Sequence, residues 1–368
     1  MNNKITVVDL FAGVGGLSYG FAKDSDFEII VANEIELNMA KAYQLNHPSV
    51  DVICKDIKYF TAQDIGCKNI DLVLGGPPCQ AYSTVGKREA DDPRGKLFLE
   101  YFRVLKELEP KVFVFENVKG LLSMQKGKLF AEIIQLFESL GYRVSYKVLN
   151  AADYGAPQIR ERVIVVGSKL KDEFEFPKPT HTAIDETLFS TNLKPYLSLS
   201  DAISDLPFIS SGEEGLEYAK EPQNEFQKTM RKNAPTVLTE HSASKNNENL
   251  VRLMKALPDG GTPADLPIEL RPKSGFANTY CKLWWNRPST TITRNLGTPS
   301  SSRCIHPKAH RALTTREGAR LQCFPDDYIF YGSRSDKNLQ IGNAVPVVLS
   351  VALKESIKHY FKLSSLSI

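Results

Sequence analysis

The sequence has few cysteines and no pair of them at a metal-binding spacing. Its six cysteines lie at positions 54, 67, 79, 281, 304 and 323 of 368 residues. A chain of this length builds its core without disulfide bonds, so we expect reduced thiols. Cys304, His306 and His310 offer ligand atoms, but no C-x-x-C motif accompanies them and a fourth ligand is not evident. We therefore favour an ordinary loop there and expect no metal.

The sequence also lacks the features of secreted and membrane proteins. Residues Met1 to Val8 contain no basic stretch, apolar run or small-residue cleavage site of a secretory signal. No uninterrupted apolar stretch approaches the roughly 20 residues that a membrane-spanning helix needs. We expect a cytoplasmic protein with no membrane partner.

Acidic residues are scarce in one part of the chain. The segment from Arg271 to Arg320 holds ten Lys or Arg and one acid, Glu317, a net charge of +9 that leaves −6 for the rest. Charge separated in this way predicts a face that meets a polyanion, although a solvated basic loop is an alternative. Trp284 and Trp285 lie in this segment. We favour packing in a small domain over base stacking for both.

From Ile5 to Gly167, short β-rich runs alternate with helical patterns, which is typical of a parallel sheet wrapped by helices. Helices are expected over 96–109 and 345–361. The fold class is α/β, a Rossmann-like sheet with helices on both faces, plus a smaller irregular domain. We expect a larger domain over 1–175, a smaller domain over 176–300 and a return segment over 301–368 that completes the larger domain. Strands are predicted at Ile5–Asp9, Phe27–Ala32, Val50–Cys54, Asp71–Leu74, Val112–Phe115, Tyr142–Val148 and Val163–Val166.

Three glycines, Gly13, Gly15 and Gly16, follow the first predicted strand. Glycine lets a backbone approach a ligand closely, and an acid after the second strand, here Glu34, binds ribose hydroxyls in nucleotide sites. Asp56 follows the third strand and offers an acceptor for an adenine amine. These residues predict a nucleoside site. The spacing differs from the dinucleotide G-x-G-x-x-G pattern, so a nicotinamide-dependent oxidoreductase and a simple tight turn are alternatives.

The fourth predicted strand leads into Gly75-Gly-Pro-Pro-Cys79-Gln, and the fifth ends in Glu116-Asn-Val. Two prolines fix a rigid elbow before the thiol and place it at the sheet edge where α/β proteins bind ligands. A thiolate that adds to carbon 6 of cytosine makes carbon 5 nucleophilic, and a carboxylic acid at ring nitrogen 3 stabilises the resulting charge. Cys79 and Glu116 fit these roles. A buried structural cysteine and a solvated acid are the alternatives.

With these residues the chain resembles the DNA cytosine carbon-5 methyltransferases of bacterial restriction-modification systems over nearly its whole length. The matching segments are Phe11-Ala-Gly-Val-Gly-Gly16, Pro77-Pro-Cys-Gln80, Asp92-Pro-Arg-Gly-Lys-Leu-Phe98, Glu116-Asn-Val118, Asp153-Tyr-Gly-Ala-Pro-Gln-Ile-Arg-Glu-Arg162, Leu313-Thr-Thr-Arg-Glu-Gly-Ala-Arg-Leu-Gln322 with Phe324-Pro-Asp326, and Gln340-Ile-Gly-Asn-Ala-Val-Pro346. The chain departs from many relatives at Ile35, Lys55 and Cys323. None of these departures affects the nucleophile.

The resemblance implies S-adenosylmethionine as methyl donor, S-adenosylhomocysteine as product, and roles for individual residues. It makes residues 1–175 the catalytic and cofactor-binding domain and residues 176–300 the target-recognition domain. Residues 80–96 correspond to a loop that closes over the target. The implied cofactor contacts are Phe11, Gly13, Gly15, Glu34, Ile35, Asp56, Ile57, Pro78, Leu97 and Asn343. The implied catalytic residues are Cys79, Glu116, Arg162 and Arg160. The implied DNA contacts are Gln80, Ser83, Arg94, Asn117, Thr291, Arg294 and Arg303.

The resemblance implies double-stranded DNA as substrate, from which the target cytosine is flipped out, and a monomeric enzyme associated with the nucleoid. A restriction endonuclease that acts separately is a further implied partner. Methyltransferases of the same fold that act on transfer RNA are the alternative, but their Cys-Phe-Thr motif is absent here. A DNA-binding protein without catalysis is disfavoured by the intact set of Cys79, Glu116 and Arg162.

Overall fold

The computed structural model describes residues 4–66, 69–78, 97–183, 192–273 and 275–366. Contacts divide the chain into two units. The sheet unit comprises residues 1–150, 161–178 and 349–368, and the loop unit comprises residues 151–160 and 179–348. Residues 301–348 thus belong to the loop unit, and the chain returns to the sheet unit later than the expected boundary at 301.

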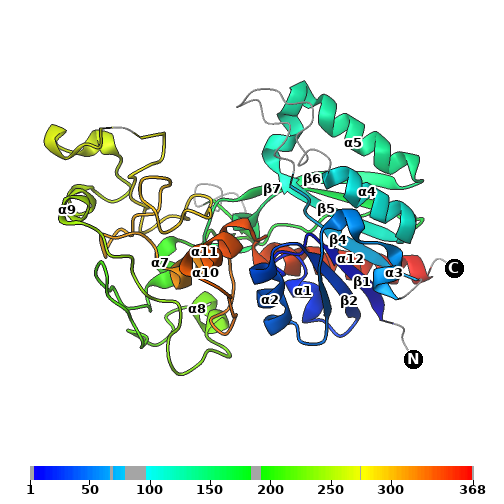
Figure 1. Ribbon diagram of the computed structural model, residues 1–368, viewed down its shortest axis with the longest axis horizontal. Helices are drawn as coiled ribbons and strands as arrows, with labels where there is room; N and C mark the ends of the chain where they lie inside the picture. Colours follow the sequence, from blue (N-terminus) through cyan, green and yellow to red (C-terminus); the bar gives the residue numbers. More distant parts are fainter. Residues whose placement is uncertain (1–3, 67–68, 79–96, 184–191, 274, 367–368) are drawn as a thin grey trace. The chain divides into compact units, whose positions relative to one another are not determined.

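The sheet unit is built on seven strands in the order β3-β2-β1-β4-β5-β7-β6 (Figure 1). Strand β7 pairs antiparallel with both neighbours, and the other pairings are parallel. The predicted α/β fold class is confirmed, because every predicted strand overlaps an observed one. The strands are β1 Ile5–Leu10, β2 Phe27–Glu34, β3 Asp51–Cys54, β4 Leu72–Gly75, β5 Val112–Val118, β6 Arg143–Asn150 and β7 Glu161–Ser168.

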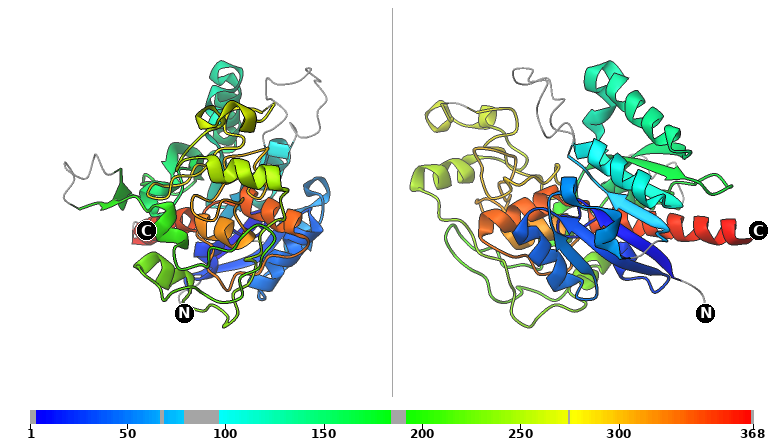
Figure 2. Two further views of the ribbon diagram at one scale, coloured as in Figure 1. Left: turned by 90° about the vertical axis from the view of Figure 1, so that its left-hand side faces the viewer. Right: turned by 45° about the vertical axis from the view of Figure 1, so that its right-hand side comes forward.

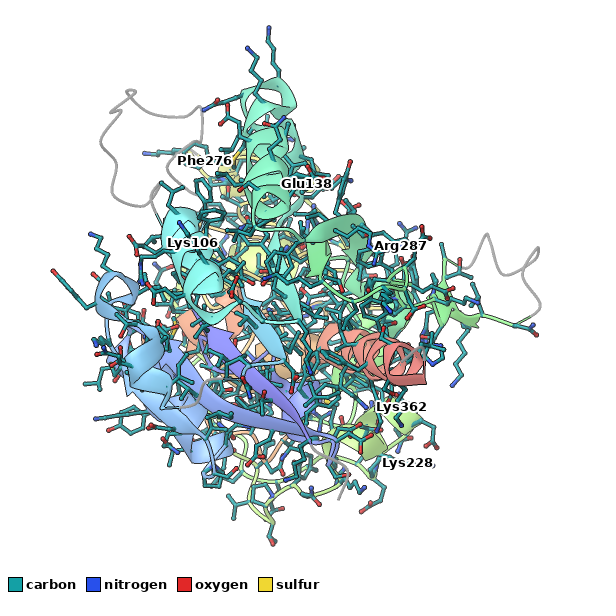
Figure 3. The ribbon with its side chains drawn as sticks, turned by 90° about the vertical axis from the view of Figure 1, so that its right-hand side faces the viewer. Lys106, Glu138, Lys228, Phe276, Arg287 and Lys362 are labelled. Atoms are coloured by element: carbon teal, nitrogen blue, oxygen red, sulfur yellow. The ribbon has the colours of Figure 1, made fainter. Side chains whose placement is uncertain are left out.

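Helices cover both faces of this sheet (Figures 1 and 2). On one face, α4 and α5 bury an aromatic cluster that includes Tyr101, Phe113, Phe115 and Phe137. The polar sides of these helices face solvent, as Lys106 and Glu138 show in Figure 3. The helical elements of the sheet unit are α1 Tyr19–Ala22, α2 Leu37–Asn46, η1 Ile57–Tyr59, α3 Ala62–Ile65, α4 Leu97–Leu108, η4 Lys119–Gly127, α5 Lys128–Ser139 and most of α12 Val347–Leu366.

Helix α12 packs closely against α1. A Cβ on Gly20 would lie 2.8 Å from the backbone nitrogen of Val351, so only glycine permits this approach. The Gly20 amide donates to Ser350 Oγ at 2.8 Å, and Lys354 pairs with Asp24 at 3.0 Å. The C-terminal helix predicted from its amphipathic pattern therefore completes the sheet unit, although it extends to Leu366 rather than ending near 361.

The loop unit consists of short elements joined by long irregular segments (Figure 1). Helix α10 packs against α7 and α11, and the interior contains buried ion pairs alongside apolar side chains such as Leu199 and Phe324. Arg320 lies between Asp205, at 2.5 Å, and Asp326, at 2.6 Å, with all three side chains at most 1% exposed. The elements are η5 Ala151–Tyr154, β8 His181–Thr182, β9 Lys194–Pro195, α7 Leu199–Ile203, α8 Glu225–Met230, α9 Glu248–Ala256, η6 Pro263–Asp265, η7 Ile268–Leu270, α10 Thr315–Leu321 and α11 Arg334–Asn343.

Candidate active site

The glycine loop leaves β1 in a conformation that favours glycine. Gly13 and Gly15 have φ of +55° and +86°. A Cβ on Gly15 would lie 2.9 Å from the ring of His47, whereas a Cβ on Gly13 would meet nothing within 4 Å. The backbone is therefore packed against α2 at Gly15 and open at Gly13, where a ligand can approach it.

Glu34 ends β2 and lies against this loop. Its Oε2 accepts from the Gly13 amide at 2.8 Å and its Oε1 from the Glu36 amide at 2.9 Å. The side chain is buried, and burial raises the pKa of its carboxyl group while the backbone amides oppose the rise. Ile35 is 58% exposed beside it. A fixed carboxylate beside an exposed apolar side chain fits the ribose and base of a nucleoside.

An acid that the sequence reasoning did not assign lies beneath the loop. Asp9 is 1% exposed at the end of β1. Burial raises the pKa of its carboxyl group to about 7, against hydrogen bonds from Ser18 and Tyr43 and with a contribution from Glu34. Its position at the end of the first strand, shortly before the glycines, is the sequence feature that could have identified it. The side chain ties α1 and α2 to the first strand.

The remaining cofactor candidates of the sheet unit follow other strands. Asp56 caps η1 by accepting from the Lys58 amide at 3.0 Å, and Ile57 is buried. Pro78 is exposed after β4, and Leu97 begins α4 half-buried. These positions agree with a site along the carboxyl ends of the strands, the edge where α/β sheets bind ligands.

Glu116 and Arg162 form an ion pair on neighbouring strands. Arg162 Nε lies 2.8 Å from Glu116 Oε1, and each side chain is 12% exposed. Because β5 and β7 are antiparallel with Val118 opposite Arg162, the two side chains are diagonal neighbours. A Cβ on Gly76 would lie 2.8 Å from Glu116 Oε2, so glycine leaves room for this carboxylate beside the elbow.

Asn117, for which a DNA contact is expected, also makes a hydrogen bond within the sheet unit. It is 5% exposed, and its amide nitrogen donates to the Pro77 carbonyl at 2.8 Å. It therefore holds the two-proline elbow against β5. Cys79, Gln80, Ser83 and Arg94 lie outside the described residues.

Arg160, for which a catalytic role is expected, is surrounded by backbone carbonyls. It belongs to the loop unit, is 1% exposed, and donates to the carbonyls of Ile292, Gly342 and Ala344 at 2.6–3.0 Å. A guanidinium used in this way positions the backbone around it. In the same unit, Asn343 is exposed at the end of α11.

The basic segment divides into exposed and buried members. Arg303, for which a DNA contact is expected, is 9% exposed, donates to the Gly260 and Lys282 carbonyls at 2.9 and 2.6 Å and stacks on Trp284. Thr291 and Arg294 are exposed. Only part of the +9 charge therefore faces solvent. The exposed members are Arg271, Lys273, Arg287, Arg294 and Lys308, and the buried ones are Lys282, Arg303, Arg311, Arg316 and Arg320.

The remaining side chains of interest in this segment are used internally. Trp285 packs edge-on against Phe208 at 5.5 Å. His306 Nδ1 accepts from two backbone amides, and burial lowers its pKa to about 4.

Among the described residues, no group of three or more His, Cys, Asp or Glu is placed to hold a metal ion, and no helix is long and apolar enough to cross a membrane.

The comparisons with known proteins agree with this geometry. The family model of C-5 cytosine-specific DNA methylases matches residues 5–359. The chain is 36% identical over 361 residues to the Type II methyltransferase M1.HphI of Haemophilus parahaemolyticus, covering 96% of this chain and 87% of the relative. It is 38% identical over 383 residues to the Type II methyltransferase M.DdeI of Desulfomicrobium norvegicum, covering 97% and 89%.

A solved structure of a methyltransferase encoded within an Escherichia coli prophage has the same fold, with a TM-score of 0.76 at 24% identity, covering 98% of this chain and 100% of that one. Fold and site thus define an α/β methyltransferase. The chain belongs to the C-5 cytosine-specific DNA methylase family. The predicted activity, methylation of cytosine carbon 5 in DNA, is confirmed by this membership, and the RNA alternative is not favoured.

Proposed function

We propose that this protein methylates cytosine at one specific sequence in duplex DNA, with Cys79 as nucleophile and Glu116 and Arg162 beside the base. The Glu116–Arg162 ion pair carries the proposal, because it holds a carboxylate at the sheet edge beside the elbow that leads to Cys79. A flipped cytosine needs a carboxyl group at that place to stabilise the charge on its ring.

S-adenosylmethionine fits the glycine loop. The open backbone at Gly13 and the carboxylate of Glu34, held by two amides, suit the ribose of a nucleoside. When bound, the sulfonium supplies an electrophilic methyl group. We propose Phe11, Gly15, Ile35, Asp56, Ile57, Pro78, Leu97 and Asn343 as its further contacts.

The proposed reaction needs one thiolate and one acid. The Cys79 sulfur forms a bond to ring carbon 6, and Glu116 donates a hydrogen bond or a proton to ring nitrogen 3. The methyl group that a bound S-adenosylmethionine would supply would go to carbon 5, with the electrons of its old bond remaining on the donor's sulfur. A base, which solvent water can supply, would then accept the proton of carbon 5, and the electrons of that C–H bond would expel the Cys79 thiolate from carbon 6 and restore the aromatic base. Arg162 orients Glu116 throughout, since it is paired with it.

The DNA contacts we propose are Gln80, Ser83, Arg94, Thr291 and Arg294. Phosphate contacts by exposed basic side chains offset the cost of about a few kcal/mol for flipping the base. We further propose that the enzyme works as a monomer at nucleoid DNA in the cytoplasm, with a separate endonuclease cutting the same sequence. The Type II names of its relatives support that partnership.

Transfer of a labelled methyl group tests the proposal. Purified protein with S-adenosylmethionine is expected to label duplex DNA and not transfer RNA, and Cys79→Ala to lose at least about 10⁴-fold in rate while it still binds DNA. Bisulfite sequencing of DNA from cells expressing the protein maps the target sequence. Preferential labelling of RNA, or full activity of Cys79→Ala, would refute the assignment.

A further inference from the structure

Two segments of the loop unit carry exposed site candidates and are joined by a buried set of polar side chains. Residues 291–294 hold the proposed DNA contacts Thr291 and Arg294, and residues 341–344 hold the proposed cofactor contact Asn343. Between them lie Gln158, Arg160 and Gln322, each at most 1% exposed. We call these three residues the buried clamp.

The clamp binds both the backbone amide and the backbone carbonyl of Ile292. Gln158 Oε1 accepts from the Ile292 amide at 3.0 Å, and Arg160 Nη1 donates to the Ile292 carbonyl at 2.6 Å. Thr291 Oγ1 also donates to the carbonyl of Ile159, the residue between the two clamp members, at 2.9 Å. The backbone that carries the proposed DNA contacts is thereby fixed from residue 291 to 292.

The other segment is bound just as directly. Arg160 Nη2 donates to the carbonyls of Gly342 and Ala344 at 2.8 and 3.0 Å. Gln322 Nε2 donates to those of Ile341 and Ala344 at 2.6 and 3.2 Å, and its Oε1 accepts from Gln158 at 2.7 Å. The bonded carbonyls flank Asn343 on both sides, so the clamp sets the place of its exposed side chain.

Close packing adds a second constraint on the same two segments. A Cβ on Gly342 would lie 2.1 Å from the Arg294 backbone nitrogen and 2.4 Å from the Thr293 carbonyl carbon. The end of α11 therefore rests directly on the backbone of residues 293–294. We therefore expect a change in either segment to move the other, because hydrogen bonds and close packing both connect them.

We propose that Gln158, Arg160 and Gln322 are positioning residues that present the DNA-contacting and cofactor-contacting segments of the loop unit in one fixed relation. This inference rests on the proposed function, since Thr291, Arg294 and Asn343 have their roles only there. It assigns a shared purpose to three buried polar side chains whose interactions are otherwise only structural. Loosening the clamp weakens the binding of both ligands.

Gln322→Met tests this directly, since methionine keeps the length of the side chain and removes all its hydrogen bonds. Gln227→Met is the matched control. Gln227 is also a fully buried glutamine of the loop unit, and it donates to the Asp201 carbonyl and Ser204 Oγ without touching either segment. Both variants lose comparable stability from unmade hydrogen bonds. Only Gln322→Met disturbs the clamp.

The measurements are the dissociation constant of S-adenosylhomocysteine by calorimetry and that of duplex DNA carrying the mapped target by fluorescence anisotropy, both below the melting transition of every variant. Gln322→Met is expected to weaken both about fivefold or more, the equivalent of one lost hydrogen bond. Gly342→Ala, which removes no hydrogen bond, is expected to do the same, and Gln227→Met to change neither.

Three results would overturn the proposal: equal weakening by Gln227→Met, weakening of only one ligand by both clamp-disturbing variants, or unchanged binding in both. Failure of the proposed function is a separate outcome, because it is seen in the wild-type protein. A wild-type chain that transfers no methyl group and binds no S-adenosylhomocysteine would refute the proposed function before any clamp variant is compared.

Discussion

The two units use charged side chains in opposite ways. In the sheet unit the core is aromatic and aliphatic, and the acids Glu34 and Glu116 stand at the strand ends in contact with backbone or one partner. In the loop unit, arginines and carboxylates such as Arg320 and Asp205 form part of the interior. The acids at the strand ends of the sheet unit are therefore candidates for chemistry, whereas the buried ion pairs of the loop unit stabilise its fold.

The largest effect that distinguishes the units is expected at Glu116. Glu116→Gln removes the acid proposed to act on ring nitrogen 3, so kcat should fall about 10²–10⁴-fold with little change in melting temperature. Methyl incorporation at saturating substrates measures it. Glu161→Gln, which loses only a half-exposed pair with Lys119, is the neighbouring control and should keep full activity. Equal rates for both variants would remove Glu116 from the chemistry.

The reverse pattern is expected at Arg320. Arg320→Met leaves the carboxylates of Asp205 and Asp326 buried without their main partner, which costs about 3–5 kcal/mol of unfolding free energy. Chemical denaturation measures the loss, and the rate of the remaining folded protein should be near that of the wild type. Lys228→Met, at an exposed pair, should leave the melting temperature unchanged. A stable but inactive Arg320→Met protein would contradict the structural role of Arg320, and with it the contrast between the units.

A smaller effect concerns pH and the loop unit. Burial holds the pKa of His306 at about 4 in the folded protein, below the ordinary 6.5, so the unfolded chain takes up this proton first as the pH falls. The stability that the neutral ring contributes is present above pH 6.5 and is lost as the pH falls through 4. Between pH 7 and 5 the loss should be about 1–2 kcal/mol.

His306→Asn isolates this contribution. The amide oxygen can accept from the Lys308 and Ala309 amides as the ring nitrogen does, but it does not titrate. Unfolding free energies of both proteins at pH 7 and pH 5 should show a smaller acid loss in the variant. Parallel pH curves would mean that His306 is not the group responsible.

The smallest effect is expected at the exposed basic residues. Arg294→Ala should weaken DNA binding only a few-fold and reduce the slope of log affinity against log salt by about 1, because one phosphate contact is lost. Arg303→Met should instead lower stability and leave that slope unchanged, since its guanidinium is used internally. Anisotropy titrations at several salt concentrations measure both slopes. Equal slopes for the two variants would contradict the division of the basic segment.

The sequence predicts the sheet unit well because its signals are local. Each strand is a short β-rich run, and the glycines, Glu34 and Glu116 follow strands that parallel pairing brings to one edge. The inward use of Arg160, Arg303 and Asn117 could not be predicted in this way. Each is a polar residue whose partners are backbone carbonyls 21 to 184 positions away, and no periodicity marks such contacts.

The charge count shows the same limit. Ten basic residues in one segment predict a polyanion-binding face, yet Arg320 is neutralised by Asp205, which lies 115 positions earlier in the chain. Net charge along the sequence cannot distinguish a paired interior arginine from a surface one. Gln158 was visible within a motif, but only the fold shows that it meets Gln322 and Ile292.

Trapping the covalent intermediate tests the central claim most directly. Wild-type protein with S-adenosylmethionine and duplex DNA carrying 5-fluorocytosine at the mapped target should form an adduct that survives denaturing electrophoresis, because fluorine cannot leave carbon 5 as a proton does. Cys79→Ala should form none. A wild-type enzyme that methylates ordinary DNA but gives no adduct, or an adduct that persists in Cys79→Ala, would contradict attack by this sulfur.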